Sequence, residues 1–185
     1  MNLFIINKDP ILAAQEQCDK HVVKMIVESA QMLSTVHRML DGKETRRPST
    51  SGKTMAKYFV LPDDRENVLY RACHFNHPCT IWTRESVHNY RWHYLHFAAL
   101  CDEYTYRYNK IHSTDTKLRK ALEQLPTNIP VKKMTPFKLA MGSNPECIKE
   151  DAVESYRAFY HTKQYRFKMD WTKRKVPEWF EYANV

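Results

Sequence analysis

The chain has 185 residues, 43% hydrophobic and 27% charged, values that fit one globular domain and exclude a disordered segment. Only three glycines are present, which argues against an all-β fold because glycine supplies the turns of hairpins and barrels. The excess of 29 Lys and Arg over 21 Asp and Glu gives a net charge of +8, which favours nucleic acid as the partner.

From the N-terminus, residues 1–7 are expected to form a short extended segment or an arm held against the core. Asp9-Pro10 is typical of a helix start, with a capping carboxylate followed by a proline that needs no hydrogen bond. The main helix is predicted over 19–41 from an apolar stripe at helical spacing, with Gly42 as a left-handed stop.

The middle of the chain combines a polar loop with a long helix. Residues 43–57 are basic and poor in apolar side chains, which predicts a mobile loop. Asp63 or Asp64 can cap a helix to about Cys73, and a break at 76–78 precedes a long helix over about 83–109.

The C-terminal part is expected to hold shorter helices and an irregular end. Short helices are predicted over 114–125 and 135–142, and a third long one over about 146–165. The aromatic, proline-broken segment 171–185 is expected to pack without forming a helix. Together these elements predict a single all-α domain, residues 1–185, built on two or three long helices.

No apolar run approaches the roughly 18 residues of a membrane span, and the N-terminus lacks a secretory signal pattern. A cytoplasmic monomer is therefore expected. Its five cysteines are expected to be free thiols, because a reducing compartment does not maintain disulfides.

Two short motifs are more economically explained by structure than by ligands. Ser51-Gly52-Lys53-Thr54 lacks the earlier glycine of a phosphate-binding loop, since position 47 is Arg47. The run from Cys73 to Cys79 offers zinc-ligand types without a second pair at comparable spacing. We therefore predict no metal and no cofactor.

The polar face of the main helix carries a candidate acid–base centre. It consists of residues at helical spacing: His21, Lys24, Glu28, Gln31, Thr35 and Arg38. Charged neighbours and burial can tune a carboxylate for proton transfer, but the same pattern fits a solvated helix face with a Lys24–Glu28 pair.

Aromatic and basic residues alternate from His88 to Tyr94, a pattern that also suits nucleic-acid binding. Rings stack on unpaired bases while cations contact phosphates. At helical spacing the rings are expected in the core, which leaves Arg84, Arg91 and His93 for a ligand.

Several segments together resemble the pyrimidine-dimer DNA glycosylases of the phage endonuclease V type. Asp19-Lys20-His21 followed by Glu28 resembles the family's Asp-x-His and its catalytic Glu seven residues later. Asn76-His77-Pro78, the opening Met-Asn-Leu-Phe and the terminal segment 177–182 (PEWFEY) match other parts of the pattern. The chain is closer still to phage proteins that share CDKHVVKM and PEWF and have no assigned activity.

This resemblance implies a compact helical fold and base excision from damaged DNA. The N-terminal α-amine, here that of Met1, would attack C1′ of the damaged nucleotide and form a Schiff base. Glu28 would be the acid–base carboxylate and His21 a site-shaping or phosphate contact. Trp179 would be an aromatic side chain beside the DNA. Apart from these carried-over roles, Lys24, His77, Arg84 and Arg91 are also expected to bind the nucleic acid.

The sequence departs from the family at residues near the nucleophile. Asn2 is large enough for Met1 to be retained, whereas the family exposes a small residue's amine. Val27 and Gln31 replace the family's phosphate-binding arginines. Two alternatives thus stay open, a DNA-base modifying or transferase enzyme and a non-catalytic nucleic-acid binder.

Overall fold

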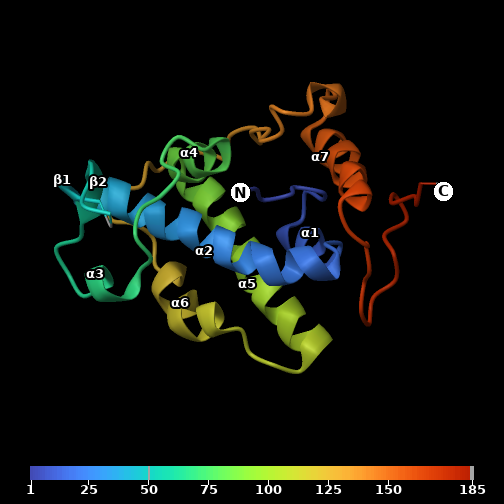
Figure 1. Ribbon diagram of the computed structural model, residues 1–185, viewed down its shortest axis with the longest axis horizontal. Helices are drawn as coiled ribbons and strands as arrows, with labels where there is room; N and C mark the ends of the chain where they lie inside the picture. Colours follow the sequence, from blue (N-terminus) through green and yellow to red (C-terminus); the bar gives the residue numbers. More distant parts are fainter. Residues whose placement is uncertain (50, 184–185) are drawn as a thin grey trace.

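The computed structural model of the protein describes residues 1–49 and 51–183 (Figure 1). Its elements are α1 (Pro10–Gln15), α2 (Asp19–Asp41), β1 (Lys43–Pro48), β2 (Met55–Val60), α3 (Arg65–Val68), α4 (Pro78–Glu85), α5 (Val87–Tyr108), α6 (Ser113–Glu123), η1 (Pro145–Cys147), α7 (Ala152–His161) and η2 (Thr162–Tyr165). The fold is therefore mostly helical, with one small antiparallel sheet.

The two long helices, α2 and α5, pack against each other at the centre of the fold, and α1, α4 and α6 pack around this pair. The β1–β2 hairpin lies at one end of α2, whereas α7 and the C-terminal segment lie toward its other end (Figure 1). This arrangement leaves the N-terminus beside the middle of the molecule, close to α2.

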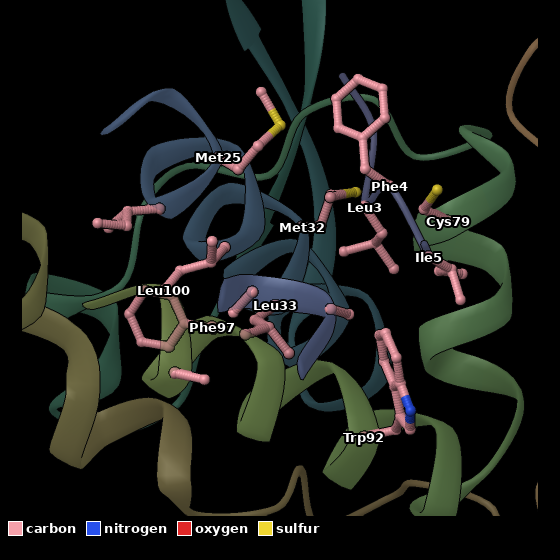
Figure 2. Packing of buried hydrophobic residues seen from close by; sticks show 14 of the residues in the cluster. Leu3, Phe4, Ile5, Met25, Met32, Leu33, Cys79, Trp92, Phe97 and Leu100 are labelled. Atoms are coloured by element: carbon pink, nitrogen blue, oxygen red, sulfur yellow. The ribbon is translucent and has the colours of Figure 1, made fainter. Parts of the chain in front are cut away.

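The first residues of the chain are part of the core, as the sequence predicted for a tucked arm. Leu3 to Ile6 are at most 5% exposed. Figure 2 shows Leu3 and Ile5 among side chains of α2, α4 and α5, such as Leu33 and Cys79, whereas Phe4 points away from Leu3. Burial of these apolar side chains fixes the position of the residues that precede them.

Helix α2 has the predicted bounds, but its end differs from the prediction. Gly42 has φ −91° and ψ 158°, so it is extended and not left-handed. Glycine is required there by proximity, because a Cβ would lie 2.4 Å from the carbonyl oxygen of Arg38 and 3.2 Å from that of Val60. The backbone thus turns directly from the helix into the hairpin.

The predicted mobile loop over 43–57 is wrong for the residues that the structure describes, with Thr50 lying outside them. Lys43–Pro48 and Met55–Val60 pair as antiparallel strands, and Arg46 faces Lys57 across the pair. The all-α prediction is corrected accordingly. Gly52 at the turn has φ +70°, a conformation that glycine adopts without strain.

Other predicted helices are shorter or absent. The helix expected to reach Cys73 is limited to α3, and the segment 135–142 is not helical. The third long helix is the ten-residue α7 followed by a 3-10 turn. Pro78 begins α4 instead of only ending a helix, and Ser86 separates α4 from α5 by capping the latter.

The C-terminal segment packs without regular structure over its described part, as predicted. Trp171 and Phe180 are each 6% exposed. All five cysteines are free thiols. None of the described helices combines the length and apolar character needed to cross a membrane.

Candidate active site

The N-terminal amine lies against the polar face of α2. The α-amino nitrogen of Met1 is 3.7 Å from Oε2 of Glu28, and the backbone N–H of Asn2 donates to the same oxygen at 3.1 Å. Lys24, one helical turn earlier, places its Nζ 3.3 Å from Oε1. Glu28 is 13% exposed, so its carboxylate is largely withdrawn from solvent while it contacts two cationic groups.

Asn2 holds the terminal segment in this position. Its side-chain amide donates to the carbonyl of Ala140 at 2.8 Å, and its side-chain oxygen accepts from the N–H groups of Leu3 and Phe4 at 2.8 and 3.1 Å. Phe4 has φ +51°, an uncommon value for a non-glycine residue, which the Asn2 bonds stabilise. The large residue at position 2 therefore fixes the direction of the amine.

A pocket of about 310 Å³ opens in front of Met1 and Glu28. Its opposite wall comes from α7 and the turn after it, with Phe159, Lys163, Arg166 and Phe167. The N-terminus, Lys24, Lys163 and Arg166 thus face a single carboxylate among the lining residues. A basic pocket of this size suits a small anionic ligand or one nucleotide unit of a chain.

Lys163 is the least expected member of this pocket. The residue is 7% exposed, and its Nζ lies 3.4 Å from the centre of the Phe159 ring. Burial, followed by the charge of Arg166, lowers the pKa of Lys163 to about 8. Among the described residues no carboxylate lies within ion-pair distance of it. Its spacing of four from Phe159 was the only sequence signal for this position.

His21 forms the apolar side of the pocket. Its ring stacks on Phe4 at 4.4 Å, and its Nδ1 is 2.8 Å from the hydroxyl of Tyr160. Burial, and then the charges of Lys24 and Lys163, lower the pKa of His21 to about 3. The ring is therefore neutral at physiological pH, which favours the site-shaping role over a charged phosphate contact.

His77 lies near the amine on the other side. Its Nδ1 accepts the N–H of Cys79 at 3.2 Å and so caps α4. Its pKa is lowered, first by burial and then by the positive charge of the N-terminus. The Asn76-His77-Pro78 segment thus starts α4 and also brings a polar side chain to the edge of the site.

Four of the predicted ligand-binding residues lie elsewhere. Arg84 donates to the carbonyl of Phe75 at 2.6 Å, a structural contact. Arg91 is exposed on α5 and lines a separate cavity with Tyr90 and Tyr94. Trp179 is half-buried.

The contacts of Trp179 place it behind the pocket instead of in its wall. Its Nε1 donates to Oε2 of Glu16 at 2.8 Å, and its ring lies edge-on to that of Tyr160 at 5.9 Å. Since Tyr160 bonds His21, Trp179 supports the site from a second layer. His93, also considered for a ligand, is fully buried.

The zinc-ligand types between Cys73 and Cys79 have separate structural partners. Cys73 pairs its backbone with the hydroxyl of Thr35, and the thiol of Cys79 is 3.9 Å from the hydroxyl of Tyr156. Within residues 1–49 and 51–183, no group of three or more potential ligand side chains is arranged to hold a metal ion.

Compared with known proteins, the chain matches no family model, no curated protein and no solved structure. The chemistry of the pocket is therefore inferred from its own residues.

Proposed function

We propose that the protein is a DNA glycosylase and abasic-site lyase of the base-excision type, with the N-terminal amine as nucleophile. The observation that supports this best is the 3.7 Å separation of the Met1 nitrogen and Glu28 within a basic pocket. An amine and a carboxylate at this distance provide a nucleophile and a proton-transfer group for one reacting carbon.

On an abasic site the reaction begins at the aldehyde carbon, C1′. The neutral amine adds to it, the Glu28 carboxylate takes up the proton that the nitrogen loses, and Glu28 returns this proton to the hydroxyl, which leaves the carbinolamine as water. The product is an imine between the amine and C1′. Glu28, again a carboxylate, then removes a C2′ proton, the electrons move toward the imine, the 3′ phosphate leaves, and water hydrolyses the imine to release the sugar and the amine.

With an intact damaged nucleotide, the same amine displaces the base at C1′. The nucleotide must leave the duplex for the amine to reach this carbon, and the pocket volume of about 310 Å³ suits one extrahelical unit. Lys24, Lys163 and Arg166 would then contact the flanking phosphates, since each is a cation that lines the pocket.

The proposal tolerates either state of the initiator methionine. With Met1 present, its amine faces Oε2 of Glu28 at 3.7 Å. With Met1 removed, the nitrogen of Asn2, at 3.1 Å from the same oxygen, would become the terminal amine. The mass of the intact protein identifies which amine is available.

The deciding experiment is borohydride trapping on a duplex with one abasic site, using wild type, an N-terminally blocked protein and Glu28→Gln. An adduct that disappears on blocking is the expected result. Binding without an adduct would refute the lyase proposal and favour the alternatives, a base-modifying or transferase enzyme or a non-catalytic binder.

A further inference from the structure

The β1–β2 hairpin is a basic, exposed element away from the pocket. Its exposed side chains include five cations: Lys43, Arg46, Arg47, Lys53 and Lys57. Its one acid, Glu44, is paired with Lys57 at 3.0 Å. An element with this imbalance repels itself in isolation and gains free energy from a polyanion.

Two guanidinium groups converge on one aromatic ring of this hairpin. Arg47 lies 5.7 Å and Arg71 4.5 Å from the centre of the Tyr58 ring. Neither arginine has a carboxylate within ion-pair distance among the described residues. The nearby Glu66 is already bonded by Arg38 and by the N–H of Leu61.

These groups border a hollow that is open to a ligand. Arg47, Tyr58 and Arg71 line a cavity of about 150 Å³. Both guanidinium groups therefore line one cavity beside the neutral Tyr58 ring, which leaves their charges uncompensated. Paired guanidinium groups of this kind match the oxygens of a phosphate, to which each can donate two hydrogen bonds.

The pocket in front of Met1 and Glu28 is called the terminal-amine pocket below. The hairpin and this pocket are connected along one face of α2. Glu28 and Thr35 lie two turns apart on it, and Arg38, at its far end, donates to the carbonyl of Phe59 in β2 at 3.0 Å. The segment 69–77 runs along this face, where Cys73 bonds Thr35. It carries Arg71 at the hairpin and His77 near the amine.

We propose that Arg47, Tyr58 and Arg71 bind a phosphodiester of the same nucleic acid whose damaged nucleotide enters the terminal-amine pocket. The position of the damage in this proposal rests on the proposed function. One nucleic acid can supply phosphates to both basic surfaces. An acidic protein segment would explain the charge of the hairpin alone.

The distance between the two surfaces gives the proposal a length scale. Asp41, where α2 ends at the hairpin, follows Glu28 by 13 residues, about 20 Å at about 1.5 Å per residue. Along a duplex this corresponds to about 6 base pairs at about 3.4 Å each. The hairpin would therefore contact DNA only when the duplex extends beyond that point.

The test measures affinity for undamaged and abasic duplexes with flanks of about 4 or about 12 base pairs. The variant is Arg47→Gln/Arg71→Gln. Its matched control, Lys110→Gln/Lys175→Gln, removes two exposed charges from other parts of the surface. Arg47→Lys/Arg71→Lys retains the charge and shows whether the substitutions merely damage the hairpin.

We expect wild type and the control to bind the long duplex at least about tenfold more tightly than the short one. The Gln variant should lose most of this gain, and its salt dependence should flatten by about two counterions. The Lys variant should keep the salt dependence. Equal losses on short and long duplexes, or an equal loss in the control, would overturn the proposal.

The same set of variants and duplexes tests this proposal separately from the proposed function. A length-dependent loss on undamaged DNA supports the hairpin contact even if no borohydride adduct forms. Conversely, if the Gln variant binds the long duplex as tightly as wild type does, the hairpin contact is refuted, whatever the trapping result. Binding of an acidic peptide with no preference for long DNA would also refute it.

Discussion

The Met1 amino nitrogen and the Glu28 carboxylate face each other at 3.7 Å although 27 positions separate the two residues in the chain. The contact depends on two elements: the buried segment that ends at Ile6, which aims the terminus, and α2, which presents Glu28. Both must be in place before the amine and carboxylate can act together.

Glu28→Gln should reduce the single-turnover rate of adduct formation by about 10²-fold or more, the usual contribution of a positioned acid–base group. Glutamine retains an oxygen that can accept from the N–H of Asn2, so the arm should stay in place. The rate is measured by borohydride trapping with protein in excess over DNA. A rate within threefold of wild type would remove Glu28 from the chemistry.

Lys163→Met should separate stability from binding. Lys163 is buried against Phe159, and its lowered pKa reports a charged form that the folded state disfavours. Methionine fills similar volume without the charge, so Tm should be unchanged or up to about 3 °C higher. DNA affinity should fall about tenfold, as measured by fluorescence anisotropy.

The matched variant for this prediction is Lys168→Met, a lysine that is 84% exposed and paired with Asp170. It removes one charge from the neighbouring segment but none from the pocket lining. A similar loss of affinity in both variants would show that Lys163 contributes only net charge. A fall in Tm for Lys163→Met would indicate a structural role instead.

Much of α2 could be predicted from the sequence, because the spacing of residues close together in the chain determines the helix and its faces. The spacing of His21, Lys24 and Glu28 placed them on one helical face, and the structure brings all three into one pocket. That the N-terminus joins them is implied only by the resemblance to the endonuclease V type. Nothing local to Met1 predicts that contact.

The opposite wall of the pocket depends on long-range packing. Phe159 and Lys163 reach the site because α7 folds back against the N-terminal arm, where Phe4 lies 6.0 Å from Phe159. The segment 135–142, predicted as a helix, is irregular because its backbone bonds other elements. The side chain of Asn89 accepts from Thr135, and Asn2 donates to Ala140.

The hairpin was missed for a related reason. β1 (KETRRP) is polar and almost entirely exposed, so it lacks the alternation of a half-buried strand, and only its partner β2 (MAKYFV) is largely apolar and partly buried. The hairpin is held by cross-strand pairing and by Arg38, which donates to the carbonyl of Phe59. The Ser51-Gly52 pair was the available turn signal, and the left-handed φ of Gly52 shows its use.

Acid should destabilise the protein well before its carboxylates titrate. Burial lowers the pKa of His21 and His96 to about 3 and that of His37 to about 4, and that of His93 is also lowered. Below the unfolded pKa of about 6.5, the unfolded chain binds protons at these residues and the folded chain does not. Stability is therefore present above pH 6.5 and is lost as pH falls toward 4.

Each of these histidines should lower the free energy of unfolding by about 1 kcal/mol between pH 7 and pH 5.5, as measured by urea unfolding. His96→Gln keeps a polar group near Gln17, whose amide nitrogen is 3.2 Å from His96. For this variant, the difference in unfolding free energy between pH 7 and pH 5.5 should be smaller by about 1 kcal/mol. Equal unfolding free energies for wild type at the two pH values would contradict the prediction.

Arg107 links α5 to the start of α2, and its loss should be among the most destabilising changes. Its side chain is fully buried and bonds Asp19 at 2.8 Å, Glu103 at 2.7 Å and the carbonyl of Gln15 at 2.9 Å. Arg107→Met leaves the buried Glu103 with Arg174 alone, so the free energy of unfolding should fall by about 3–5 kcal/mol.

Arg174→Met provides the comparison, because it removes the other cation from the same carboxylate. The Arg174 side chain is 32% exposed, so water can replace part of its contact, and the loss should be about 1 kcal/mol. Urea unfolding at pH 7 measures both. Similar losses in the two variants would mean that burial of Arg107 adds nothing. A much larger loss for Arg107→Met would identify the Asp19–Arg107–Glu103 cluster as the structural support of the helix that carries His21 and Glu28.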